Sequence, residues 1–145
     1  MTIACAGLVQ QARGATYLLD DSATHVMTPN AQMEWRSTAP GRSPDNDVET
    51  WVRVNIRIDT RPWIGHSGRV YMVLEQDAGP RLTVEWQTQG RLLDGRLVSG
   101  ERALVFAGAI TQPMLEDWLL LHLRTDGRWM SNSRRLQFHF ELTTD

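Results

Sequence analysis

The chain has 145 residues, with 15 basic and 17 acidic side chains and a formal net charge of −2. A domain of this length buries roughly 70% of its unfolded surface, so it folds without disulfide or metal staples. The charge balance excludes a nucleic-acid binder that works by neutralising phosphates. No apolar run reaches the roughly 20 residues of a membrane-spanning helix, and the single cysteine, Cys5, excludes an internal disulfide framework.

Two residue types have unusual counts. All 15 basic residues are arginine, which excludes mechanisms that depend on a catalytic or phosphate-binding lysine. The chain also holds six tryptophans against three phenylalanines and two tyrosines. A buried tryptophan needs a partner for its N–H group, so we expect some of the six to lie at a surface or interface.

The amino-terminal stretch supports two interpretations. Met1 to Val9 are apolar or small and uncharged, and Ala12-Arg13-Gly14 forms a small-x-small cleavage pattern, so residues 1–15 read as a signal remnant. The run from Thr2 to Cys5 is also similar in outline to a lipoprotein box, which again points to export. The alternative is an ordinary first strand with a buried, free Cys5. We predict a periplasmic or extracellular location, with a cytoplasmic one as the alternative, and one domain over residues 16–145.

Residues 20–49 are rich in Ser, Thr, Pro, Asn and Asp. Short strands are predicted near 25–27 and 32–35, and turn-forming residues predict a loop over 39–47.

Metal ligands have weak support in the sequence. Asp45, Asp47 and Glu49 alternate as Ca²⁺ ligands do, but without the glycine and register of an EF-hand, so we predict a solvated acidic loop. The histidines share no ligand spacing, although His122 and His139 could face each other on neighbouring strands. We therefore expect neither a metal nor a cofactor.

From residue 51 onward, apolar and polar residues alternate with period two, which is typical of half-buried strands. An Asp94-Gly95 pair between apolar residues predicts a tight hairpin over 92–97. The predicted strands cover residues 51–58, 69–75, 81–87, 103–107 and 135–142.

Residues 112–124 are ambiguous, because Met114, Trp118 and Leu121 lie at helical spacing. We predict a short helical turn near 112–117 that leads into a strand over 118–124. Seven or eight short strands without intervening helices predict an all-β, single-domain antiparallel β-sandwich, immunoglobulin-like or jelly-roll-like.

The loop over residues 59–68 is the most distinctive candidate site. Arg61, Trp63 and His66 could present a flat ring, a fork of donors and an imidazole at one end of the sheets. The alternative is that Pro62-Trp63 packs under the sheet as an anchor. The Gly-His-Ser-Gly run at 65–68 lacks the spacing of a nucleophile elbow, so no catalytic residue is expected.

A second candidate lies on the first long strand, where Trp51, Arg53 and Arg57 share one face. An exposed Trp beside arginines can stack on a partner or pair with it.

These features predict a non-enzymatic cell-envelope protein that binds or assembles with another protein, for example in a surface appendage or secretion assembly. An edge strand would be a natural docking site. The alternative is a carbohydrate-binding module with Trp51, Trp63 or Trp129 as platforms, and a small β-barrel enzyme is a third reading.

Overall fold

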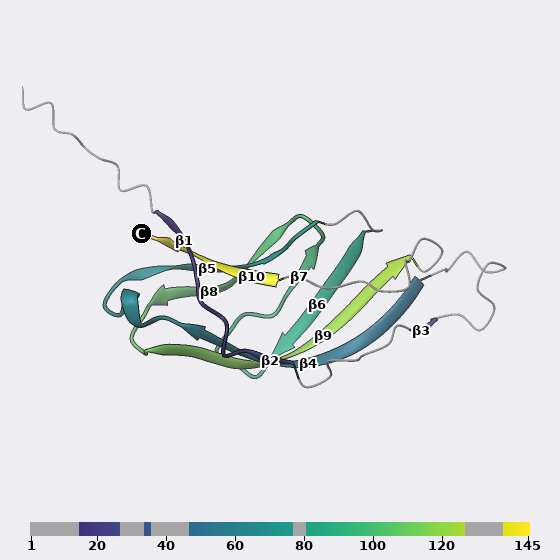
Figure 1. Ribbon diagram of the computed structural model, residues 1–145, viewed down its shortest axis with the longest axis horizontal. Helices are drawn as coiled ribbons and strands as arrows, with labels where there is room; N and C mark the ends of the chain where they lie inside the picture. Colours follow the sequence, from purple (N-terminus) through teal and green to yellow (C-terminus); the bar gives the residue numbers. More distant parts are fainter. Residues whose placement is uncertain (1–14, 27–33, 36–46, 77–80, 127–137) are drawn as a thin grey trace, which may run out of the picture.

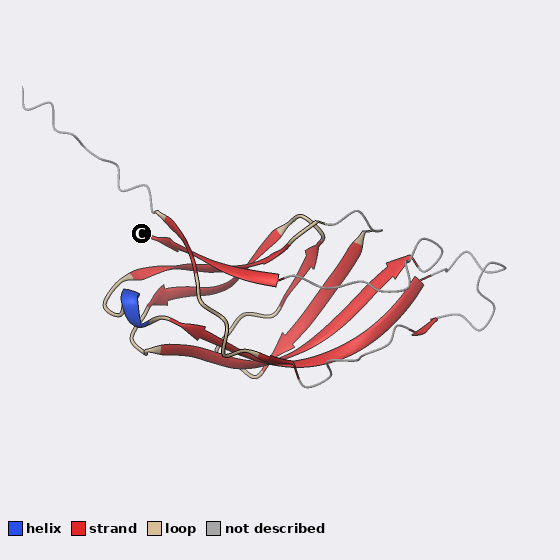
Figure 2. Ribbon diagram, in the orientation of Figure 1, coloured by secondary structure: helices blue, strands red, loops and turns tan. Residues whose placement is uncertain are grey.

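The computed structural model describes residues 15–26, 34–35, 47–76, 81–126 and 138–145 (Figure 1). Their regular structure is almost entirely β-strand, arranged in two antiparallel sheets that pack face to face (Figure 2). This architecture confirms the predicted β-sandwich. Within these ranges, no helix has the length and apolar character needed to cross a membrane.

The smaller sheet has four strands, and each is antiparallel to its neighbour. Their order across the sheet is β1 (Thr16–Leu18), β10 (Phe138–Thr144), β5 (Ser67–Leu74) and β8 (Arg102–Ala109). Both β1 and β8 are therefore edge strands.

The larger sheet is built around two strands of 13 residues, β4 and β9, which pair along their whole length and are the longest arrows in Figure 1. The short β3 (Glu34–Trp35) pairs with one end of β4. The order of the other strands is β2 (His25–Val26), β4 (Asp47–Asp59), β9 (Met114–Asp126), β6 (Leu82–Thr88) and β7 (Gly95–Val98).

The core lies between the sheets and holds the residues that the alternation placed inward. Ile58, Val70, Val84 and Leu142 have no exposed surface, so these strands bury one face each. Phe138 packs against the core while remaining partly exposed. The buried apolar side chains are Leu19, Val52, Val54, Ile56, Ile58, Val70, Met72, Leu74, Leu82, Val84, Trp86, Leu92, Leu97, Val105, Ile110, Leu119, Leu121, Leu123, Phe140 and Leu142.

The predicted helical turn near 112–117 is wrong, because β9 is extended from Met114 onward and pairs there with Asp59 of β4. The short helix lies elsewhere, as a 3₁₀ turn η1 over Arg61–Trp63, where Pro62 occupies one of the first helical positions. This turn belongs to the segment that carries the chain from β4 in the larger sheet to β5 in the smaller one.

Two further predictions also need correction. Asp94-Gly95 is not the centre of a two-residue hairpin, since β6 ends at Thr88 and β7 begins at Gly95. Residues 89–94 connect them. His122 and His139 do not face each other either, because His122 lies on β9 of the larger sheet and His139 on β10 of the smaller one.

Candidate binding surface

The outer face of the larger sheet carries an exposed patch of aromatic, apolar and basic side chains. On β4 and β9, Trp51 pairs with His122, Arg53 with Leu120 and Asn55 with Trp118, in three successive rows. Paired residues of an antiparallel ladder project to the same side of the sheet. We call the surface formed by Trp51, Arg53, Trp118, Leu120 and His122 the tryptophan face.

Apolar exposure on this face is high for residues in the middle of a sheet. The exposed fraction is 52% for Trp51 and 38% for Leu120, although each has a cross-strand neighbour beside it, His122 and Arg53 respectively. Trp118 is half-buried. A contiguous exposed apolar patch with polar neighbours is typical of an interaction surface.

Neighbouring side chains hold the Trp51 ring in place. The His122 imidazole stacks on it with ring centroids 4.1 Å apart and an angle of 14° between the planes. His122 Nε2 lies 2.5 Å from a Glu49 carboxylate oxygen, which fixes the imidazole in turn. Trp51 is therefore an ordered platform, and little side-chain entropy remains to be lost when a partner covers it.

Charged side chains surround the apolar part of the face. The Arg53 guanidinium lies 6.0 Å from the centroid of the Trp118 ring, within the range of a cation–π contact. Arg57 donates from Nε to the Asn55 side-chain oxygen at 2.8 Å and forms an ion pair with Glu116 at 3.5 Å. On the opposite flank, Glu85 forms ion pairs with the side chains of Arg96 and Arg124.

The structure divides the six predicted site residues between two places. Trp51, Arg53 and Arg57 share the outer face of β4, as the alternation predicted, with Arg57 only partly exposed. The other three residues, Arg61, Trp63 and His66, lie in the segment that joins the two sheets.

In that segment the ring of Trp63 packs against the core and lies 5.6 Å from the Tyr17 ring, in the position of the predicted anchor. Arg61 donates to both carboxylate oxygens of Asp59, at 3.0 and 2.7 Å, and these bonds lower the pKa of Asp59. His66 is exposed. The three residues do not form one open platform, because the ring is turned inward and the guanidinium is paired.

Sequence reasoning missed the half of the tryptophan face that β9 supplies. Trp118, Leu120 and His122 alternate with buried leucines, and this period-two signal was present in the sequence. The strand predicted over 118–124 is confirmed, but the sequence does not show that it pairs with β4, so these side chains were not placed beside Trp51.

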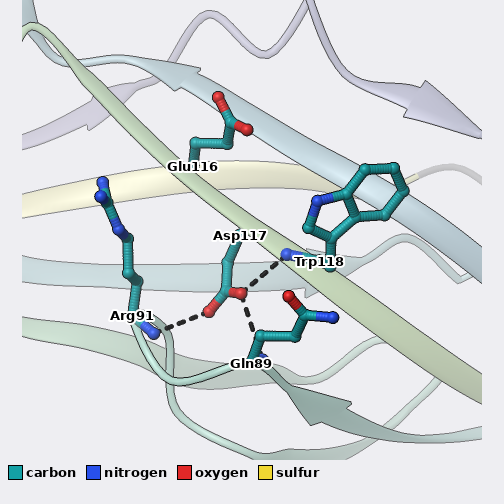
Figure 3. A pocket seen from close by; sticks show the side chains of 5 residues that line it. All are labelled: Gln89, Arg91, Glu116, Asp117 and Trp118. Atoms are coloured by element: carbon teal, nitrogen blue, oxygen red, sulfur yellow. Dashed lines mark hydrogen bonds between the residues drawn. The ribbon is translucent and has the colours of Figure 1, made fainter.

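Asp117 was also missed, and it shapes the end of the face. It points to the buried side of β9, with 5% of its surface exposed, and accepts four hydrogen bonds from backbone N–H groups. Its oxygens lie 3.1 Å from the N–H nitrogen of Gln89, 2.8 Å from that of Arg91 and 2.7 Å from that of Trp118 (Figure 3). The fourth donor is the N–H group of Leu92, also at 2.8 Å. Asp117 thereby fixes the 89–92 loop against β9.

The electrostatics of Asp117 follow from these bonds. Burial alone would raise the pKa of the carboxyl group, but the four backbone donors outweigh it and hold the pKa of Asp117 below its ordinary value. The carboxylate is therefore charged at neutral pH. Beside it, Gln89, Arg91, Glu116, Asp117 and Trp118 line an open pocket of about 350 Å³.

Of the predicted acidic group, Glu49 bonds to His122, Asp47 begins β4, and Asp45 lies outside the described residues, as do Cys5 and Trp129. The part of the chain that the structure describes contains no group of three or more His, Cys, Asp or Glu side chains placed to hold a metal ion.

Comparisons with protein-family models, with curated proteins and with solved structures found no match for this chain.

Proposed function

We propose that this chain is a non-enzymatic binding module of the bacterial cell envelope and that it docks on a partner protein through the tryptophan face. The observation that carries the proposal is the exposed, stacked ring of Trp51 beside Arg53 and Leu120. Trp and Arg supply much of the binding energy at the centres of protein interfaces, because Trp buries a large rigid ring and Arg presents a planar fork of donors. The charged residues around the face would form its polar rim.

The state of the buried carboxylate supports a role without catalysis. Among the described residues, Asp117 is the buried acid, and four backbone donors occupy its two oxygens. An acid or base in catalysis must exchange a proton with a substrate, which this arrangement opposes. Residues 1–9, which are apolar or small and uncharged, support export as part of the same proposal.

The test is photo-cross-linking in the native source. A photoreactive residue at position 120, on the face, should cross-link one partner, whereas the same residue at position 107, exposed on the edge strand β8, should not. The Trp51→Ala variant should lower the cross-linked yield about tenfold. Mass determination of the captured chain should show that the amino-terminal residues have been removed.

The matched control is Leu18→Ala, which removes another exposed apolar side chain, 70% exposed, from the smaller sheet. It should leave the yield unchanged, and thermal unfolding should show that both variants fold. Cross-linking from position 107 but not from position 120 would show that the partner docks by strand addition at β8 and not on the tryptophan face. Cytoplasmic partners together with an unprocessed chain would contradict the envelope location.

A second candidate function, carbohydrate binding, is favoured by the placement of the two indole rings. Trp51 and Trp118 lie on one face of the sheet, four residues apart along the strand and on adjacent strands, which corresponds to roughly 14 Å between their Cα atoms. An oligosaccharide of a few rings could span both. Binding of polysaccharides on a glycan array, with no protein cross-link from position 120, would favour this function over protein docking.

A further inference from the structure

We infer that the pocket beside the 89–92 loop binds a single neutral hexopyranose unit. The pocket has a volume of about 350 Å³, in the size range of small-molecule sites. Figure 3 shows Asp117 at its centre, with the side chains of Glu116, Trp118 and Arg91 around it. The inference extends the carbohydrate-binding candidate and does not depend on docking of a protein.

The floor of this pocket is rigid before any ligand arrives. The four bonds to the Asp117 carboxylate join the backbone of the 89–92 loop to β9, so the loop cannot easily change shape. The Thr88 hydroxyl adds a bond to the Leu92 carbonyl at 2.8 Å. A preformed backbone reduces the ordering cost of binding, which matters most for a small ligand with few contacts.

One wall of the pocket is aromatic. Trp118 is one of the lining residues, its ring is half-buried, and the Arg53 guanidinium lies 6.0 Å from the ring centroid. The C–H face of a pyranose ring is flat and apolar, so it packs on an aromatic ring while the hydroxyl groups point outward to polar side chains.

The polar groups of the pocket are mixed in kind. The negative charges of Glu116 and Asp117 are balanced by Arg91 and by Arg57, which forms an ion pair with Glu116. Arg91 supplies only donors, Glu116 supplies only acceptors, and the Gln89 amide supplies both. The Glu116 carboxylate oxygens lie 3.5 Å from Asn55 Nδ2 and 3.5 Å from Arg57 Nε, so this side chain is held in place. The Arg91 side chain is exposed and can turn to a ligand. Sugar hydroxyls both donate and accept, so a neutral polyol can satisfy all three side chains. A ligand carboxylate would meet Glu116, and a ligand ammonium group would meet Arg91.

The test is an NMR titration of the full ¹⁵N-labelled chain with the methyl glycosides of glucose, galactose, mannose and N-acetylglucosamine. The six tryptophans give six indole signals, which single Trp→Phe variants assign. At least one glycoside should shift the Trp118 signal, with a Kd on the order of 1 mM. Glucuronate and glucosamine should bind several-fold more weakly, because each carries a charge that the pocket opposes.

Arg91→Ala should weaken binding about tenfold and leave the fold intact, because the bond to Asp117 comes from the backbone of residue 91. Arg96→Ala, another exposed arginine on the same sheet, is the matched control and should leave the affinity within about twofold of wild type. The inference would be overturned if none of the four glycosides changed the spectrum, or if the Trp118 signal did not shift. It would also be overturned if glucuronate bound more tightly than the neutral glycosides. Arg91 lies outside the tryptophan face, so this result and the cross-linking result can fail separately.

Discussion

Replacing Asp117 by Ala should lower the free energy of unfolding by about 4 kcal/mol, measured as a lower urea midpoint at unchanged slope. The substitution leaves four backbone N–H groups without their acceptor, at Gln89, Arg91, Leu92 and Trp118. Each unsatisfied buried donor costs about 1–3 kcal/mol, and water entering the open pocket recovers part of the sum.

Two variants separate the hydrogen bonds from the mere loss of a side chain. Asp117→Asn keeps the shape but replaces one accepting oxygen by an amide donor, so we expect an intermediate loss of about 2 kcal/mol. Asp94→Ala is the matched control, because Asp94 is exposed and accepts one backbone bond, from Thr88 at 2.8 Å. A loss at Asp117 no larger than that at Asp94 would contradict the role of these four bonds.

The same carboxylate predicts how stability depends on acid. The four backbone donors keep the pKa of Asp117 in the folded chain below the ordinary value of 3.8. Its contribution is therefore complete above that value and is lost as pH falls toward the lower folded pKa. Unfolding free energies measured from pH 5 to pH 2 should fall more steeply for the wild type than for Asp117→Asn. Parallel curves would contradict the lowered pKa.

The core strands could be predicted from the sequence because alternation depends on local geometry alone. Val52, Val54, Ile56 and Ile58 face inward whichever strand pairs with β4, so their pattern is visible without knowledge of the partner. The partner itself could not be read in this way. The pairing of β4 with β9 joins Trp51 to His122, and such distant contacts leave no local signal in a single chain.

The candidate site was half predictable for the same reason. Trp51 and Arg53 were placed on one face by the period of β4. Trp118 and Leu120 lie in the strand predicted over 118–124, but the sequence does not show that this strand lies beside β4. Pairing with β4 also keeps residues 114–117 extended, where a helical turn was predicted. Asp117 resembles an ordinary surface acid in the sequence. Its role depends on donors from a loop about 25 residues away in the chain.

Gly95→Ala should destabilise the protein by about 2 kcal/mol, although Gly→Ala in a strand usually stabilises. A Cβ atom at this position would lie 2.6 Å from Cζ2 of Trp86, its cross-strand partner. The ring cannot move aside cheaply, because only 3% of it is exposed and its Nε1–H donates to the Leu93 carbonyl at 2.9 Å. The glycine of the Asp-Gly pair is thus needed for ring packing rather than for a tight turn. Urea unfolding followed by tryptophan fluorescence measures the change.

A double-mutant cycle tests whether the Trp86 ring is the cause. Trp86→Phe removes the part of the ring that the new methyl group would strike, so the combined variant should be more stable than the sum of the single changes by about 1 kcal/mol. Arg96→Ala, at the next and exposed position of β7, should change stability by less than about 0.5 kcal/mol. If Gly95→Ala proved neutral or stabilising, backbone propensity would govern this site and the close packing of Trp86 on Gly95 would be wrong. If it proved destabilising without rescue by Trp86→Phe, the strain would lie in the backbone of β7 instead.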